Sequence, residues 1–200
     1  GSSAALCVAL IRARAALENR EASLEEIHEK GFALEQVFHG TPSGIDHAVA
    51  ARGGALYYRK DNEPVVLDMP PLPAVILDSG TAGNTAELVA RVARARPQVD
   101  PALNQLGEFA DIARDNLTDM HLIGDLMVEA HALLKTIGVS TQTLDELVAL
   151  AMEHGALGAK LSGAGGGGVV VALVPEDPEP LLQAALHRGI QAFACTLPRS

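Results

Sequence analysis

Hydrophobic positions in the first part of the chain recur at helical spacing. The Ala-rich apolar run Leu6–Leu17 predicts a buried helix, with Ser2 or Ser3 as its N-cap. Ser23 is followed three residues later by Glu26, and this capping-box pattern predicts the start of a second helix. The chain therefore opens with two helices in close succession.

Shorter elements follow up to residue 73. Gly44 permits a turn into a short helix over residues 45–49, and two glycines at 53 and 54 end it. Apolar runs then predict a strand at Ala55–Arg59 and a partner strand at Val65–Asp68. The four prolines in Pro64–Pro73 indicate a boundary or a rigid connection between two substructures.

The remaining pattern alternates strands with helices. Ala74–Asp78 reads as a buried strand, Asn84–Arg96 as an amphipathic helix, and the region up to His154 is helix-rich. Thr143 and Glu146 repeat the capping-box pattern. The end of the chain predicts strand, helix and strand, at Val169–Val174, Pro180–His187 and Ile190–Thr196. With the earlier strand, this predicts a split β-α-β layer that has helices on one face.

Composition narrows the function classes. The net charge is −10 and aromatic residues make up only 3% of the chain, which argues against a nucleic-acid partner. No apolar run approaches the roughly 18 residues that span a bilayer, and no signal peptide is visible, so no membrane partner is expected. Cys7 and Cys195 lie far apart, lack metal-site spacing and fit buried thiols in a reducing, cytoplasmic compartment.

Two stretches carry chemistry. HGTPSGID, residues 39–46, ends in a carboxylate just after a Pro-Ser-Gly turn. KLSGAGGGG, residues 160–168, places five glycines in six residues before an apolar strand. A carboxylate that can meet a hydroxyl, together with bare backbone for a phosphate, is what phosphoryl transfer requires.

A third motif, GSSAA, lies at the start of the chain. GSSAA at the start resembles the end of the phosphate loop of the GHMP kinase superfamily (galactokinase, homoserine kinase, mevalonate kinase, phosphomevalonate kinase), and KLSGAGGGG resembles its C-terminal glycine-rich motif. HGTPSGID is most similar to the mevalonate kinase branch, as are DSGTAGNTAELVARV (residues 78–92) and LLKTIGVSTQTLDEL (residues 133–147). The resemblance runs along almost the whole chain.

The resemblance implies an α+β fold in two parts. Residues 1–70 resemble the C-terminal part of the superfamily's N-terminal, ATP-binding domain, and residues 71–200 its ferredoxin-like C-terminal domain with added helices. The implied reaction is ATP-dependent phosphorylation of the C5 hydroxyl of mevalonate, with Mg²⁺, for isoprenoid synthesis. Members of this superfamily carry roughly a hundred further upstream residues, including a lysine beside the catalytic Asp. We therefore expect a fragment with exposed apolar surface at the first helix and at residues 55–68, and little activity alone.

Asp46 is the candidate catalytic residue, because a carboxylate can orient or accept the proton of the attacking hydroxyl. Taken alone, the position of Asp46 favours a helix N-terminal residue that only stabilises the helix dipole. The resemblance favours catalysis, and it implies that Glu35, eleven residues earlier, helps to bind Mg²⁺. The alternative for Glu35 is a solvated helix face.

The same resemblance assigns the other site residues. The Ser3 hydroxyl would reach Mg²⁺, while Gly1 and Ser2 would present backbone N–H groups to phosphate. Gly-Ser-Ser at a chain start also occurs as an artificial leader, which the apolar helix behind it disfavours.

Thr85, Gly163 and Ala164 would lie on the mevalonate side of the site. Their alternatives are a first-turn helix residue for Thr85 and a simple hairpin for the glycine loop. His39 and His131 are expected to be structural.

Two other readings remain open. The chain could act on a sugar or on phosphomevalonate, although few basic residues (Arg52, Lys160) lie near the motifs. It could also be a catalytically inactive binding module. The superfamily often forms homodimers, so a homodimer is compatible with the sequence.

Overall fold

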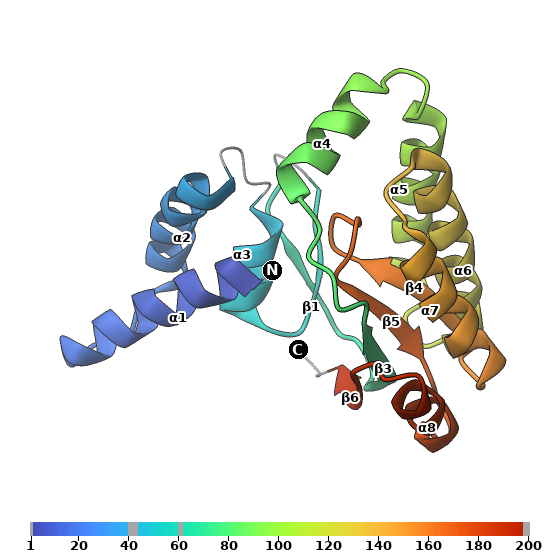
Figure 1. The fold of residues 1–200 in the computed structure, drawn as a ribbon. Helices are drawn as coiled ribbons and strands as arrows, with labels where there is room; N and C mark the ends of the chain where they lie inside the picture. The colour runs from blue at the N-terminus through green and yellow to red at the C-terminus, as the bar shows by residue number, and fades with distance from the viewer. Residues whose placement is uncertain (1, 40–43, 60–61, 198–200) are drawn as a thin grey trace. The chain divides into compact units, whose positions relative to one another are not determined.

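The computed structural model describes residues 2–39, 44–59 and 62–197, without the side chains of residues 2 and 35–39. It divides into two compact units (Figure 1). Unit 1 lies within residues 1–68, and unit 2 is Met69–Leu197. The division falls inside the proline-rich segment Pro64–Pro73.

Three helices make up most of unit 1: α1 (Ser2–Leu17), α2 (Leu24–His39) and α3 (Ile45–Arg52). Each helix packs against the other two. Among the described residues, the buried cluster between them consists of Val8, Ile11, Ile27 and Ala51. The guanidinium of Arg12 also donates a hydrogen bond to the carbonyl of Ala51 at 2.6 Å, which ties α1 to the end of α3.

The ends of these helices test the capping predictions. Ser23 is confirmed as a cap, because its Oγ accepts a hydrogen bond from the Glu26 N–H at 3.1 Å. The prediction that Ser2 or Ser3 caps the first helix is wrong, since α1 already includes both residues. Serine is tolerated in a first helical turn, and the Ala-rich run behind it carries the helix back to Ser2.

Unit 1 also contains a short two-stranded antiparallel sheet. Its strands are β1 (Ala55–Tyr57) and β2 (Val65–Leu67), paired in register from Ala55 with Leu67 to Tyr57 with Val65. The two strands fall where the sequence predicts them, although each is only three residues long.

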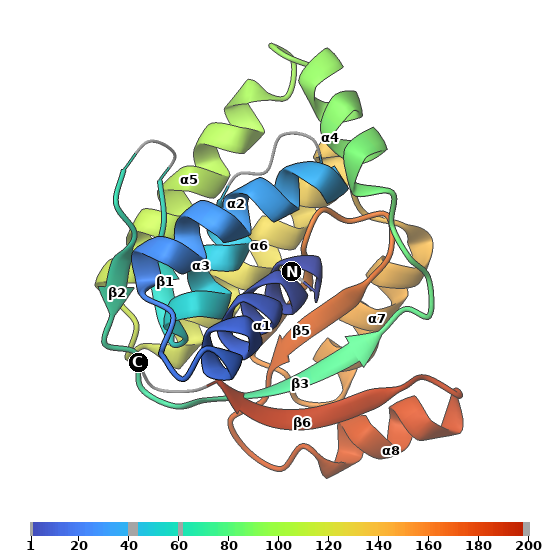
Figure 2. The same ribbon diagram turned by 90° about the vertical axis from the view of Figure 1, so that its left-hand side faces the viewer.

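Unit 2 is built on a four-stranded antiparallel sheet of order β4-β5-β3-β6. The strands are β3 (Leu72–Asp78), β4 (Gly158–Ser162), β5 (Val169–Leu173) and β6 (Ala192–Leu197). Figure 2 shows β5, β3 and β6 side by side. Strand β4 is absent from the sequence prediction, because its five residues GAKLS contain no β-branched or aromatic side chain.

Five helices accompany this sheet: α4 (Thr85–Arg94), α5 (Asp100–Asp115), α6 (Met120–Ile137), α7 (Gln142–Glu153) and α8 (Glu179–His187). Helices α6 and α7 contact β4, and α8 contacts β6. Thr141 caps α7 by accepting a hydrogen bond from the Leu144 N–H at 3.3 Å, so the predicted cap at Thr143 is wrong.

The core of unit 2 lies between the sheet and these helices. Alternate residues of the strands, such as Val75 and Leu77 of β3, pack with Leu147 and Leu150 of α7 in one large buried cluster. Glycines bring α6 and β4 together: a Cβ at Gly158 would lie 2.1 Å from the carbonyl oxygen of Gly124. The mixed helical and sheet architecture confirms the predicted α+β fold class.

Candidate functional site

Asp46 lies in the first turn of α3 with an exposed side chain. Gly44, the residue before the helix, has φ of 87°, a left-handed conformation that glycine adopts without strain. The HGTPSGID motif therefore delivers its carboxylate at a helix N-terminus that solvent can reach. Residues 40–43 of this motif lie outside the described part of the chain.

The other residues predicted in unit 1 are placed only in part. Ser3 is half-buried in the first turn of α1. Glu35 belongs to α2, but its side chain lies outside the described residues, as do the Ser2 side chain and Gly1. Of the side chains predicted for catalysis and Mg²⁺ binding, the structure thus describes those of Ser3 and Asp46.

The glycine-rich loop of residues 163–168 is held by backbone hydrogen bonds within unit 2. The Gly166 N–H donates to the carbonyl of Val139 at 2.8 Å, and the Gly168 N–H donates to the carbonyl of Thr81 at 2.7 Å. In return, the Ser79 N–H donates to the carbonyl of Gly168 at 2.9 Å. The loop after β3 and the glycine-rich loop therefore form one backbone framework.

This framework tolerates no side chain at its closest points. A Cβ at Gly83 would lie 2.2 Å from the carbonyl oxygen of Gly165, and a Cβ at Gly165 would lie 2.1 Å from that of Val139. Both distances are far below van der Waals contact, so only glycine allows the three segments to pack this closely. The loop is a packed structural unit as well as an exposed turn.

The predicted substrate-side residues lie on or beside this framework. Thr85 is the first residue of α4, exposed and next to Asn84, whose side chain caps the helix by accepting from the Glu87 N–H at 3.2 Å. Gly163 is exposed and Ala164 is half-buried. Leu88 in α4 abuts Gly166, so the helix that carries Thr85 packs against the glycine loop.

His131 supports the strand that leads into this loop. Its Nδ1 accepts a hydrogen bond from the Leu161 N–H at 3.3 Å, and its Nε2 lies 3.1 Å from Oδ1 of Asp145. Because Nδ1 is the acceptor, Nε2 carries the proton and donates a hydrogen bond to Asp145. The ring thus links α6, α7 and β4, the structural role that was predicted for it.

Electrostatics agree with a neutral His131. Burial lowers the pKa of this ring, and this effect outweighs the neighbouring Asp145 carboxylate, which raises the pKa. Burial raises the pKa of Asp145, but hydrogen bonds from Lys135 and Ser140 outweigh burial and lower the pKa. Ser140 Oγ donates to Asp145 Oδ1 at 2.6 Å.

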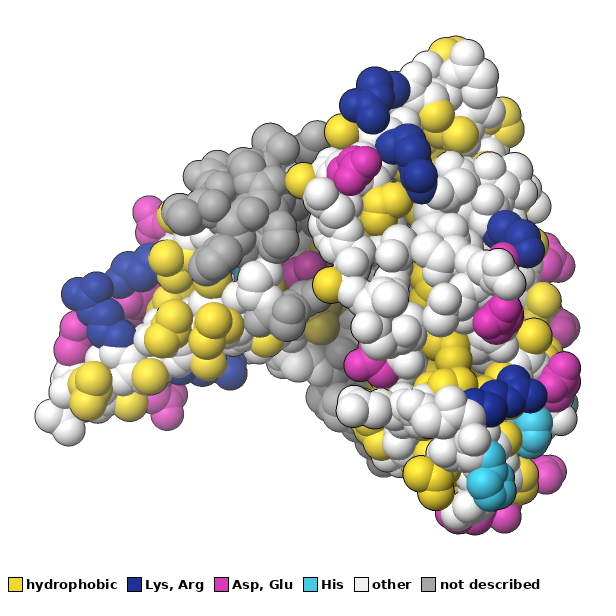
Figure 3. Space-filling model, in the orientation of Figure 1, with side chains coloured by type: hydrophobic (Ala, Val, Ile, Leu, Met, Phe, Trp, Pro, Cys, Tyr) yellow, Lys and Arg dark blue, Asp and Glu magenta, His cyan; other side chains and the backbone are white. Residues whose placement is uncertain are grey.

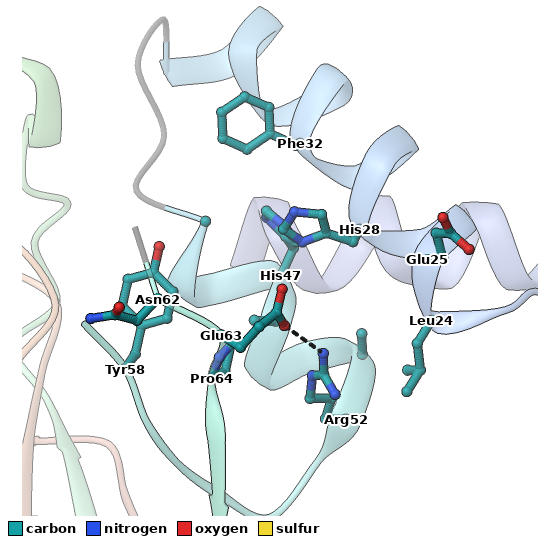
Figure 4. Close-up of a pocket in the computed structure, with 13 residues that line it drawn as sticks. Leu24, Glu25, His28, Phe32, His47, Arg52, Tyr58, Asn62, Glu63 and Pro64 are labelled. Carbon is teal, nitrogen blue, oxygen red and sulfur yellow. Dashed lines mark hydrogen bonds and ion pairs between the residues drawn. The ribbon is translucent and has the colours of Figure 1, made fainter. Parts of the chain in front are cut away.

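A feature that the sequence analysis missed lies beside Asp46. His47, the next residue, is fully buried, and its Nε2 is 3.1 Å from Nδ1 of His28 in α2. The two rings line a cavity of about 720 Å³ together with Phe32, Arg52 and Tyr58 (Figure 4). The sequence offers no signal for this pair, because the two histidines are 19 residues apart on different helices.

Two kinds of feature are absent from the part of the chain that the structure describes: a membrane-spanning helix and a cluster of metal-binding side chains. There, no helix combines the length and apolarity needed to cross a bilayer. Within the same residues, no three His, Cys, Asp or Glu side chains gather as a metal site would need.

Comparison with known proteins gives the family. The model of the GHMP kinases N terminal domain matches residues 1–54, and the model of the GHMP kinases C terminal region matches residues 102–191. Both parts of the fold and both glycine-bearing motifs are thus accounted for by one class of protein. The chain belongs to the GHMP kinase family.

Within that family, several curated relatives of the chain are mevalonate kinases. The chain is 42% identical to the mevalonate kinase of Thermococcus sibiricus over 94% of its own length and 60% of the relative's. The corresponding protein of Pyrococcus abyssi is 43% identical over 88% of this chain and 55% of the relative. The chain therefore spans about 60% of the length of the curated relatives it matches.

Solved structures agree with this placement. The crystal structure of Leishmania major mevalonate kinase in complex with R-mevalonate superposes with a TM-score of 0.87 at 30% identity, covering 99% of this chain and 65% of that one. The Methanococcus jannaschii mevalonate kinase gives a TM-score of 0.82 at 27% identity, covering 96% and 62%.

Proposed function

We propose that the protein containing this chain is a mevalonate kinase, which transfers the γ-phosphoryl group of ATP to the C5 hydroxyl of mevalonate. The observation that carries this proposal is the 42–43% identity to mevalonate kinases along most of the chain. The product would be 5-phosphomevalonate, a precursor for isoprenoid synthesis.

Asp46 would act on the acceptor hydroxyl. An alcohol has a pKa far above neutrality, so its proton must leave as the oxygen attacks phosphorus. The exposed carboxylate in the first turn of α3 is available to orient that hydroxyl or to take its proton. Transfer would be direct and in line, between ATP and mevalonate.

Residues of unit 1 would bind Mg²⁺ and the ATP phosphates. Mg²⁺ prefers oxygen donors, and with nucleotides it commonly uses one or two protein groups plus the phosphates. The Ser3 hydroxyl fits that donor set, and Glu35 would supply a carboxylate. When bound, Mg²⁺ neutralises charge on the phosphates. Gly1 and Ser2 would offer backbone N–H groups to phosphate at the start of α1.

Mevalonate would bind at the framework of unit 2 that the loop after β3 and the glycine-rich loop form. Thr85 at the start of α4 could hydrogen-bond the substrate, while Gly163 and Ala164 leave room for it. In this proposal, residues 1–70 are the C-terminal part of the ATP-binding domain and residues 71–200 the C-terminal domain.

The two cysteines are unpaired, as expected for the cytoplasm, where we place the reaction. Sedimentation would test whether the protein forms a homodimer, which the superfamily resemblance allows.

The deciding experiment is an acceptor comparison with the protein at the full length that its gene encodes. ADP release with Mg²⁺-ATP would be measured for mevalonate, phosphomevalonate, galactose and homoserine. Turnover with mevalonate alone is expected. Turnover with a different acceptor would keep the kinase fold and replace the substrate, and ATP binding without any turnover would favour an inactive binding module.

A further inference from the structure

The residue that follows Asp46 joins two helices through a partly buried hydrogen bond. His47 of α3 has no exposed surface, and its ring nitrogen lies 3.1 Å from that of His28 in α2. One ring donates its N–H and the other accepts, so exposed His28 provides a partner for a nitrogen of buried His47 that would otherwise be costly to bury. Figure 4 shows the two rings close together, tilted by 53° to each other.

Packing fixes the His47 ring from several directions. Its centroid is 5.0 Å from that of His28, and the Phe32 ring approaches it edge-on at 6.0 Å with an interplanar angle of 76°. The turn before α3 lies near the same ring: a Cβ placed on Gly44 would lie 3.6 Å from Cε1 of His47. The ring therefore packs against α2 and lies near the turn from which α3 starts.

Helix α2 also approaches closely at its middle. A Cβ placed on Gly31 would lie 3.6 Å from Cβ of His47, so glycine leaves the α2 backbone next to this side chain. His28, Gly31 and Phe32 thus form one continuous stretch of α2 against His47. Glu35 follows Phe32 by three residues along the same helix.

This arrangement links the positions of two proposed site residues. Helix α3 has only eight residues, so a ring anchored in its first turn constrains the orientation of that turn and of Asp46 within it. The anchor lies on α2, the helix that carries Glu35. We propose that His47, through its hydrogen bond to His28, is a positioning residue for phosphoryl transfer, holding the first turn of α3 in register with α2. This inference rests on the proposed function.

The test uses three variants of the full-length protein. His47→Leu removes the hydrogen bond but keeps an apolar side chain in place. His47→Gln returns an amide at about the reach of the ring Nε2. Ile27→Ala, at a buried position of α2 next to His28, is the control for simple loss of packing. For each we would measure kcat per folded protein, the free Mg²⁺ concentration for half-maximal rate, and hydrogen exchange over residues 45–52.

The proposal predicts a specific pattern. His47→Leu should lower kcat by roughly tenfold or more, since small displacements of reacting groups have large effects on rate. It should also raise the Mg²⁺ requirement and speed exchange in α3, and His47→Gln should recover most of each loss. Ile27→Ala should lower the melting temperature while leaving kcat per folded protein and the Mg²⁺ requirement near the unmodified values.

Two results would overturn it. If His47→Leu only lowers the melting temperature, as Ile27→Ala does, the pair is structural and positions nothing. If His47→Gln folds but recovers neither kcat nor the Mg²⁺ requirement, the hydrogen bond is not the cause. Absence of turnover in the unmodified protein would instead refute the proposed function, and with it the positioning role, whatever hydrogen exchange shows for α3.

Discussion

The two units differ in how completely they bury their own apolar surface. Unit 2 has a four-stranded sheet and one extended cluster of buried side chains contributed by its strands and by helices such as α7. Among the described residues of unit 1, the core cluster is limited to four side chains, and the sheet has two strands of three residues. Two-stranded sheets are marginal in water without further packing.

Helix α1 shows the difference most clearly. Ala4 and Ala15 are fully buried, yet Leu6, Leu10 and Leu17 are 55%, 56% and 85% exposed. Figure 3 shows hydrophobic side chains gathered over this helix. A helix that is apolar on all sides is normally buried on all sides. The exposed apolar surface expected for the first helix is therefore present, and unit 1, which carries Asp46, is the less self-sufficient unit.

The comparison predicts an all-or-none difference between the separated units. Residues 69–197 should fold alone and unfold cooperatively on heating, because their core lies within them. Residues 1–68 should show no cooperative transition and should bind a hydrophobic dye. Circular dichroism during heating measures this directly. A cooperative transition in residues 1–68, or none in residues 69–197, would contradict the comparison.

One substitution made in both units should give unequal effects. Leu150→Ala, at a position 1% exposed, should destabilise unit 2 by about 2–5 kcal/mol because it leaves a cavity. Leu10→Ala, at a position 56% exposed, should change stability by less than about 0.5 kcal/mol. Chemical denaturation of the chain would measure both, and equal losses would contradict the exposure of Leu10 on α1.

A pair of glycine substitutions tests whether the packing of unit 2 extends to its site loop. Gly83→Ala should cost about 1–3 kcal/mol, because its Cβ would meet the carbonyl oxygen of Gly165 and force the loops apart. Gly107→Ala, in α5 with nothing within 4 Å, should stabilise by about 1 kcal/mol. A neutral Gly83→Ala in the same denaturation experiment would mean that the framework of loops yields easily.

The smallest expected effect is a pH dependence in unit 2. Burial lowers the pKa of folded His131, while the unfolded residue titrates near about 6.5. The unfolded chain therefore binds a proton more readily, and this contribution to stability is lost as pH falls below about 6.5, by less than about 1.4 kcal/mol per pH unit. His131→Gln should flatten this part of the profile, whereas His187→Gln, at an exposed position, should leave it unchanged.

Local sequence signals predicted most helices and three of the four strands of unit 2. One of their failures came where two nearby residues compete for one role. Thr141 and Thr143 both suit an N-cap, and the choice follows from the extended backbone of Thr141, with φ −124° and ψ 162°. Only the tertiary structure sets that backbone.

The candidate site shows the same difference between features set by local sequence and features set by tertiary packing. Asp46 and the glycine loop could be found because their motifs are contiguous in sequence. The His28–His47 pair and the contact of Gly83 with Gly165 could not, since each depends on how separate segments pack.

The most direct test of the account is ADP release by the full-length protein with mevalonate and Mg²⁺-ATP, comparing unmodified protein with Asp46→Asn. Glu29→Gln, an exposed change on α2, is the control. The account predicts that Asp46→Asn lowers kcat by about 10²–10⁴-fold while the protein stays folded, and that the control is unaffected. Turnover of folded Asp46→Asn at close to the unmodified rate would contradict the central claim that this carboxylate serves the transfer.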